Sequence, residues 1–443
     1  MVWYSLIGKG AWPITRRVPN PCGFEILWDD TPVHAAQNFI KMIIEILLTL
    51  TIGICCGIIT GLIPGIHVNL ISVVLLSISP WLGQYFSFLG IGVIIISMAI
   101  THSFLDTICG TYLGMPDSDQ AMGLLPAHRM LKNGEGHNAV ILTLTGSFLS
   151  LLLGIGLFPV FLFGMKFLEP LMKEIVGYVL ILIVAFMILK EKGMKKIYSF
   201  FVFIVSGFLG MAVLNTPQLE QPMLHMLSGL FGFSLILLSL LQDSTIPKQH
   251  FDTPIGLPNL SLVKAIGGAT SIGFIAAFLP GFGSSQAAII AQQVVGDIKE
   301  KGFLVLVGGI NTANTVISIG TAYTLGKARN GAILVINKLL EGISFEVMVV
   351  FLLSAVIVSS FAVILGLRLS KKFCTLIMKV DYKKLIMSIL CFIVLLSLFF
   401  DGFLGLFILF VSTMVGLIAS KYGVGKNHLM GCLMLPVILF FVG

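Results

Sequence analysis

Polar side chains follow a Pro-Gly pair at two places in an otherwise apolar chain, at residues 64–69 and 280–286. Polar groups are costly in hydrocarbon, so these side chains should face a cavity or a polar partner. If each segment restarts as a helix, its free N–H groups and positive dipole end suit an anion, and carbonyls exposed at the break suit a cation. The alternative is that the polar groups only satisfy the broken backbone. We predict substrate binding at Pro64, Gly65, His67, Asn69, Pro280, Gly281, Ser284, Ser285 and Gln286.

A second pair of polar clusters lies further along the chain. His102 and Asp106 are four residues apart, so on a helix they share a face and could pair. An ionisable pair at the end of a span is a candidate for cation or proton coupling, although a hydrogen-bonded cap would use the same residues. Asn311 and Asn314 stand in the corresponding part of the second half, and amides bind either a carboxylate or Na⁺. We predict His102 and Asp106 as ion-coupling residues, and Asn311 and Asn314 as substrate ligands.

Small residues recur at every fourth position ahead of both Pro-Gly pairs. Residues four apart form a stripe on one face of a helix, which lets another backbone approach closely. The proline that ends each stripe removes a backbone donor and breaks the helix. A tightly packed helix that breaks in mid-span, present twice, is typical of secondary transporters built from repeats. The stripes are Gly53, Gly57, Gly61 and Gly65, and Ala269, Gly273, Ala277 and Gly281.

The composition places these elements in a membrane. Of 443 residues, 57% are hydrophobic and 11% are charged, whereas average proteins have about 25% charged residues. A span needs roughly 20 apolar residues, and the stretches of that kind predict an all-α polytopic membrane protein with about ten to twelve transmembrane helices. The basic residues behind the net charge of +7 lie in short loops, as the positive-inside rule requires, so we expect no nucleic-acid partner. The seven cysteines show no metal-binding spacing.

Lysine and arginine in the loops predict the orientation of the two halves. The basic loops 190–196 and 368–384 should be cytoplasmic. Counting spans from these loops puts loop 104–137 inside and the corresponding loop 326–344 outside. Equivalent loops on opposite sides indicate two inverted repeats, with the substrate near the midplane between two broken helices.

This topology divides the chain into an N-terminal extension, two transmembrane repeats and a linker between them. Residues 1–41 have no helical period and no apolar signal sequence, so we interpret them as an N-terminal extension or the product of a mis-assigned start. The expected spans include 138–165, 171–189, 385–400 and 403–419, and the expected external segments are 215–222 and a turn at Asp401-Gly402. The predicted units are the extension at 1–41, transmembrane repeat 1 at 42–241, a cytoplasmic linker at 242–261 and transmembrane repeat 2 at 262–443.

Four ordered motifs resemble those of a known family. They are G-L-I-P-G-I-H-V-N at 61–69, H-S-F-L-D-T-I at 102–108, Y-L-G-M-P-D-S-D-Q-A at 112–121 and L-L-P-A-H-R-M-L-K-N-G-E-G at 124–136. Together they resemble the TctA family, the large permease subunit of tripartite tricarboxylate transporters. The pattern is most similar to the shorter archaeal-type branch, and the resemblance covers roughly residues 42–443.

The resemblance implies an ion-coupled carrier for citrate-like carboxylates. Bacterial members work with a small membrane subunit and an extracytoplasmic, periplasmic binding protein, which are therefore the implied partners. They have a stretch rich in small residues where His67 and Asn69 stand here. Carried over by motif, the implied site is Pro64, Gly65, His67, Asn69, Pro280, Gly281, Ser284 and Ser285.

Two other functions stay open. A carrier of a polyprenyl phosphate or another anionic lipid would use the same helix ends, because they bind phosphate as well as carboxylate. An intramembrane enzyme has less support, since the chain has neither H-E-x-x-H nor G-x-S-x-G. We predict a multi-pass secondary transporter of the plasma membrane, not an enzyme, for a di- or tricarboxylate such as citrate. We expect Na⁺ or H⁺ coupling, no other cofactor or bound metal, and a homodimer as one form of assembly.

Overall fold

The computed structural model describes residues 32–63, 68–114, 119–241, 247–251, 254–278, 283–326, 328, 330–379 and 382–442. Every regular element in these ranges is helical. Eight of the helices are long and apolar enough to cross a membrane, and three further apolar helices are shorter. The chain is therefore an all-α polytopic membrane protein, as its composition predicts. The inverted relation of its two halves stays a prediction.

The helices form two successive runs. α1 begins at Pro32, ahead of the boundary at residue 42 that the apolar pattern suggests. The first run contains α1 (Pro32–Leu62), α2 (Val68–Ser77), α3 (Ser79–Leu82), α4 (Phe88–Ile108), α5 (Leu124–Lys132), α6 (Gly136–Gly156), α7 (Phe158–Lys190), α8 (Lys195–Leu214), α9 (Pro222–Leu227) and α10 (Ser234–Leu241). The second contains α11 (Asn259–Phe278), α12 (Ser284–Val295), α13 (Lys299–Leu325), α14 (Gly331–Leu339), α15 (Phe345–Lys379), α16 (Tyr382–Lys421) and α17 (Gly431–Val442).

The small-residue stripes pack as predicted. On α1, a Cβ added to Gly53 would lie 2.5 Å from Ser97 Cβ of α4 and 2.6 Å from the Ile94 carbonyl oxygen. In the second half, a Cβ added to Gly273 of α11 would lie 2.9 Å from Ala313 Cβ of α13. Each stripe therefore brings its helix against the next long helix of the same half, at distances that only a missing side chain permits.

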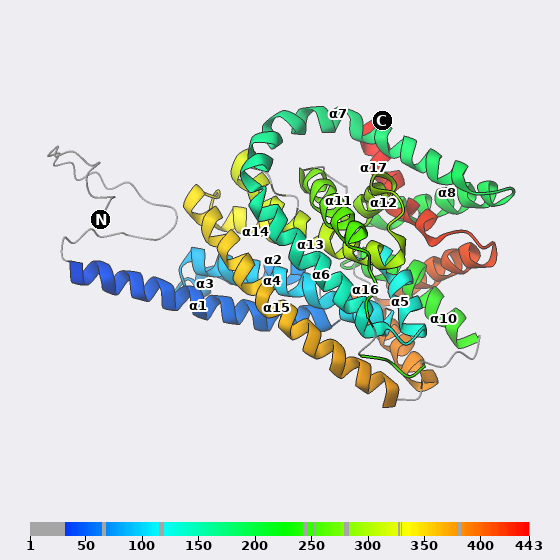
Figure 1. The fold of residues 1–443 in the computed structure, drawn as a ribbon, viewed down its shortest axis with the longest axis horizontal. Helices are drawn as coiled ribbons and strands as arrows, with labels where there is room; N and C mark the ends of the chain where they lie inside the picture. The colour runs from blue at the N-terminus through cyan, green and yellow to red at the C-terminus, as the bar shows by residue number, and fades with distance from the viewer. Residues whose placement is uncertain are drawn as a thin grey trace.

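The helices α4 and α13 form the centre of the fold. The apolar stretch of each is almost wholly buried by protein, whereas that of α1 is mostly exposed. Figure 1 shows α4, α6 and α13 in the middle of the molecule, with α1 toward one end, α8 and α17 toward the other, and α15 running obliquely across. The predicted polar clusters around His102 and Asn311 therefore lie on the two most enclosed spans.

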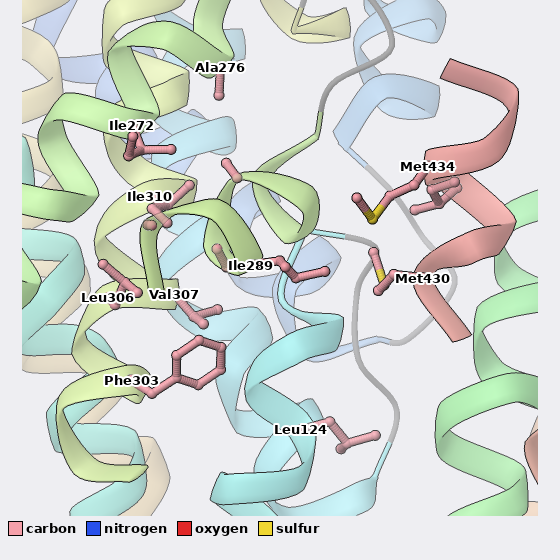
Figure 2. Packing of buried hydrophobic residues seen from close by; sticks show 14 of the residues in the cluster. Leu124, Ile272, Ala276, Ile289, Phe303, Leu306, Val307, Ile310, Met430 and Met434 are labelled. Carbon is pink, nitrogen blue, oxygen red and sulfur yellow. The ribbon is translucent and has the colours of Figure 1, made fainter. Parts of the chain in front are cut away.

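The short helices that follow the two Pro-Gly pairs, α2 and α12, are called the half-helices below. Apolar packing holds the second of them, α12, in place. Ile289 of α12 is buried beside side chains of α11 and α13. Figure 2 shows this cluster, with labels on Leu124, Ile272, Ala276, Ile289, Phe303, Leu306, Val307, Ile310, Met430 and Met434. Because close-packed interiors resist displacement, the start of α12 is held at a defined place in the core.

Two spans differ from expectation in their boundaries. The span expected at 138–165 is wrong, because α6 ends at Gly156 and α7 runs on without interruption to Lys190. Pro159 in the first turn of α7 explains the break, since proline cannot donate to the preceding turn. The turn expected at Asp401-Gly402 is confirmed, because both residues have non-helical backbone angles inside α16.

Loops assigned to the same side meet in the structure. His250 N donates to Gly134 O at 2.9 Å, and His137 Nδ1 lies 2.9 Å from Ser370 Oγ, so three loops predicted to be cytoplasmic share one end. Glu220 N donates to Asp401 Oδ1 at 2.6 Å, which joins two segments predicted to be external. These contacts agree with the grouping of the loops into two sides, and which side is cytoplasmic stays a prediction.

Candidate functional site

The first polar cluster lies at the carboxyl end of α4. His102 and Asp106 are both buried. Gln120 Nε2 donates to Asp106 Oδ1 and, at 3.3 Å, to the carbonyl oxygen of Ser103. Gln120 therefore fixes the Asp106 carboxylate against the last turns of α4. Gln120 was not among the residues predicted from the sequence, although it belongs to the polar motif at 112–121.

The second polar cluster lies between α12 and α13. Ser284, Ser285 and Gln286 form the first turn of α12 and are all buried. Asn314 Nδ2 of α13 donates to Ser284 Oγ at 3.4 Å, so the structure brings these two predicted ligands together. Asn311 is buried one turn earlier on α13.

The loop that follows each central helix reaches the half-helix of the other half. α4 continues through a π-helical turn, η1 (Cys109–Leu113), to Gly114, and α13 ends at Leu325, just before Gly326; both glycines are left-handed. Beyond Gly114, Asp119 Oδ1 accepts a hydrogen bond of 3.4 Å from Ser284 N at the start of α12. Beyond Gly326, a Cβ added to Gly331 would lie 2.5 Å from Oδ1 of Asn69 in α2.

These two crossing contacts are equivalent in position. Asp119 and Gly331 follow their left-handed glycines by the same number of residues, and Ser284 and Asn69 stand at the start of the helix after a Pro-Gly pair. One half-helix thus receives a carboxylate from the opposite half, whereas the other receives a glycine. Gly331 was not singled out from the sequence, and Asp119 was considered only together with Asp117 as a weak signal for a metal, because only the crossing of the loops gives these positions a partner.

Five of the predicted ligands cannot be placed. Pro64, Gly65, His67, Pro280 and Gly281 lie outside the described residues. The segments on both sides are described, and they show α1 ending at Leu62 and α11 ending at Phe278 before new helices begin at Val68 and Ser284. The predicted interruption of each helix is therefore present.

A small pocket lies beside Gln120, the partner of Asp106. It has room for about one water molecule. Thr111 Oγ1 faces no hydrogen-bond partner among the described residues. The pocket is lined by Thr107, Gly110, Thr111, Gln120, Gly123, Leu124, Ala127, Thr143, Leu304 and Val307. A π-helical turn often marks a functional position, and η1 forms one wall here.

A buried histidine stands next to this pocket on α5, which lies outside the eight candidate spans. Neither ring nitrogen of His128 makes a hydrogen bond of standard geometry to the described residues, although the Thr111 backbone lies close enough to raise its pKa. Burial, and secondly the charge of Lys132, lower the pKa of His128 to about 4. His128 is therefore neutral at physiological pH. It belongs to the motif at 124–136, which is the sequence signal that points to it.

A separate polar cluster joins α9 to the turn inside α16. His225 Nε2 lies 2.5 Å from Asp401 Oδ2, and both side chains are almost fully buried. His225 Nδ1 lies 3.0 Å from Ser397 Oγ, and Gln221 N donates to Asp401 at 3.0 Å. This cluster fastens the start of α9 to the α16 turn.

Comparison with known proteins agrees with these features. Residues 47–431 match the family described as "Tripartite tricarboxylate transporter TctA family". The chain is also 30% identical over 390 residues to the uncharacterized protein MJ1079 of Methanocaldococcus jannaschii, which covers 86% of this chain and 94% of that protein. No solved structure matches the chain. The archaeal-type branch within the family stays a prediction. The chain belongs to the TctA family of tripartite tricarboxylate transporters.

Proposed function

We propose that the chain carries a small carboxylate anion across the membrane by alternating access, with the starts of α2 and α12 forming two sides of its site. Family membership makes it a permease component of a tripartite tricarboxylate transporter. The observation that carries the finer proposal is the pair of crossing contacts, in which each half touches the half-helix of the other. A substrate between the two half-helices would contact both halves at once. Rocking of one half against the other would then expose the bound substrate to one side of the membrane and afterwards to the other.

The chemistry of the site suits a carboxylate. Helix starts present N–H groups and a positive dipole end, and α2 and α12 are helices that begin after breaks. Side chains of Asn69, Ser285 and Asn311 add polar groups around them. We propose a di- or tricarboxylate such as citrate as substrate, with His102 and Asp106 as the residues through which Na⁺ or H⁺ is coupled.

The remaining expectations belong to the same proposal. Two inverted repeats would give the two half-helices opposite directions, as alternating access requires. A small membrane subunit and an extracytoplasmic binding protein are proposed partners, since the family is named for three components. We propose the plasma membrane as location, and a homodimer as one assembly.

Uptake into proteoliposomes tests the proposal. Purified protein should accumulate radiolabelled citrate, or another di- or tricarboxylate, under an imposed Na⁺ or H⁺ gradient. Asn314→Ala and Ser284→Ala should reduce this uptake, because both residues belong to the buried α12 cluster. Ser344→Ala is the matched control, since it removes an exposed serine at the start of another helix, α15.

The outcomes separate the two carrier functions. Gradient-driven carboxylate uptake that Asn314→Ala loses and Ser344→Ala keeps supports the proposal. Absence of uptake for every carboxylate, together with protection of the protein against thermal unfolding by a polyprenyl phosphate, contradicts it and supports a lipid carrier.

A further inference from the structure

Two ion pairs tie the start of α13 to the first half of the chain. Arg129 of α5 lies 2.5 Å from Glu300, and Lys301 Nζ lies 3.0 Å from Oε2 of Glu135, which directly precedes α6. Lys301 also donates to the carbonyl oxygen of Ile255 at 2.9 Å. The four charged side chains are partly or well exposed, so water screens both pairs and each is individually weak.

An apolar contact between the two halves lies next to these ion pairs. A Cβ added to Gly123, which directly precedes α5, would lie 3.4 Å from Val307 Cγ1 and 3.7 Å from Leu304 Cδ2 of α13. Leu304 and Val307 are almost completely buried. We call this contact, between residues 121–132 of the first half and residues 299–307 of the second, the seam. Figure 2 shows it where the cyan α5 faces the start of α13.

The seam closes off the interior but is incompletely packed. The pocket with room for about one water molecule lies within it. Gly123, Leu124 and Ala127 line this pocket from the first half, and Leu304 and Val307 line it from the second. Atoms beside a void lose contact energy, so the two sides of the seam separate at lower cost than a fully packed core.

Three layers follow one another along α13. Glu300 belongs to the ion pairs, Val307 to the seam, and Asn314 to the buried cluster with Ser284 in the proposed substrate site. Residues 300 and 314 are about 21 Å apart along the helix axis. The seam therefore lies between the proposed site and the end of the protein where the loops predicted to be cytoplasmic meet.

We infer that the seam is the gate of the carrier at the end predicted to be cytoplasmic. It is closed in this structure and opens when the two halves rock apart, and the Arg129–Glu300 and Lys301–Glu135 pairs bias it toward closure. Weak pairs suit this task, because a carrier needs two states of similar free energy. The inference rests on the proposed carrier function, since alternating access requires such an opening.

Opening of the seam is measured without substrate or transport. Val307→Cys places a thiol that the closed seam hides from water. Purified full-length protein is treated with a charged thiol reagent, and mass spectrometry follows modification of the peptide that contains residue 307. In this background Glu300→Arg places two positive charges together and should raise the labelling rate about two- to tenfold. Adding Arg129→Glu restores opposite charges and should return the rate to its starting value.

Glu346→Arg provides the matched control. Glu346, like Glu300, is an exposed glutamate in the first turn of a long helix. Its side chain accepts a hydrogen bond of 2.8 Å from Ser344 Oγ, so it contacts its own loop and not the other half. The Glu346→Arg variant should label at the rate of the Val307→Cys background.

A disulfide across the seam tests whether transport needs the opening. A Cβ at Gly123 would lie 3.9 Å from Val307 Cβ, a distance that suits a disulfide. Oxidation of the double variant Gly123→Cys, Val307→Cys should stop carboxylate uptake into proteoliposomes, and a reductant should restore it. Each single variant should keep its uptake under the same oxidation.

Three labelling results would overturn the inference. They are an unchanged rate in Glu300→Arg, a raised rate that Arg129→Glu does not reverse, and an equal rise in Glu346→Arg. Carboxylate uptake that survives complete formation of the disulfide would also refute the gate, while it would support the proposed substrate. The expected labelling pattern in a protein that takes up no carboxylate would support the gate and refute the substrate, so the two failures are distinguishable.

Discussion

Adding one methyl group to the contact between α1 and α4 should destabilise the protein measurably. A Cβ at Gly53 would lie 2.5 Å from Ser97 Cβ and 2.6 Å from the Ile94 carbonyl oxygen. Ordinary contact begins at 3.4 Å, so in Gly53→Ala the two helices must separate by about 1 Å. Overpacking of this kind costs about 1–3 kcal/mol, and we expect the lower half of that range because α1 is peripheral and free to shift.

A matched control removes the effect of helix propensity. Alanine is favoured over glycine inside a helix by about 1 kcal/mol, which partly hides the packing cost in Gly53→Ala. Gly267 of α11 has nothing within 4 Å of an added Cβ, so Gly267→Ala gains the propensity without the clash. The difference in unfolding free energy between the two variants should therefore equal the packing cost, about 1–2 kcal/mol, with Gly53→Ala the less stable.

The assay is thermal unfolding of both variants and the wild type in one detergent at one heating rate. The comparison is made at fixed rate because membrane proteins often unfold irreversibly. The expected order of melting temperatures is Gly267→Ala at or above the wild type, and Gly53→Ala below it. If Gly53→Ala melts as high as Gly267→Ala, then α1 and α4 do not approach as closely as the small-residue stripe requires.

Three further predictions concern charged groups. Acidification should destabilise the protein through His128, because the folded state holds its pKa at about 4 while the unfolded histidine titrates near 6.5. The free energy of unfolding then decreases as pH falls from 6.5 towards 4, by up to ~1.4 kcal/mol per pH unit. The melting temperature of His128→Asn should fall less steeply with pH than that of the wild type, and an equally steep fall would contradict this reasoning. Asp401→Ala should cost about 3–5 kcal/mol in a denaturant titration, since His225 and two backbone N–H groups lose a buried acceptor, and a loss below about 1 kcal/mol would refute the buried pair. Glu300→Ala, which breaks an exposed ion pair, should cost at most about 1 kcal/mol in the same titration, and a larger loss would show that the pair is not screened.

Local spacing in the sequence determined the helical membrane class and the faces on which helices pack. A four-residue period of small side chains is a property of one helix, and it correctly predicted the close contacts of Gly53 and Gly273. Proline likewise acts on its own turn, so the interruptions before α2 and α12 were predictable. Apolar length was less informative, because it did not reveal the break at Leu157.

Only the tertiary structure decided which polar residues meet. Asp119 and Ser284 are separated by 165 positions, and His225 and Asp401 by 176. Helical periodicity tells which side chains share a face of one helix, whereas these partners come from loops of one half that cross to helices of the other. The Gln120 contact to Asp106 lies within the first half, but its two residues are 14 positions apart on different elements, so helical periodicity does not specify it either. The amino-acid sequence thus determined what each element is, and the packing of the two halves determined which polar groups form the site.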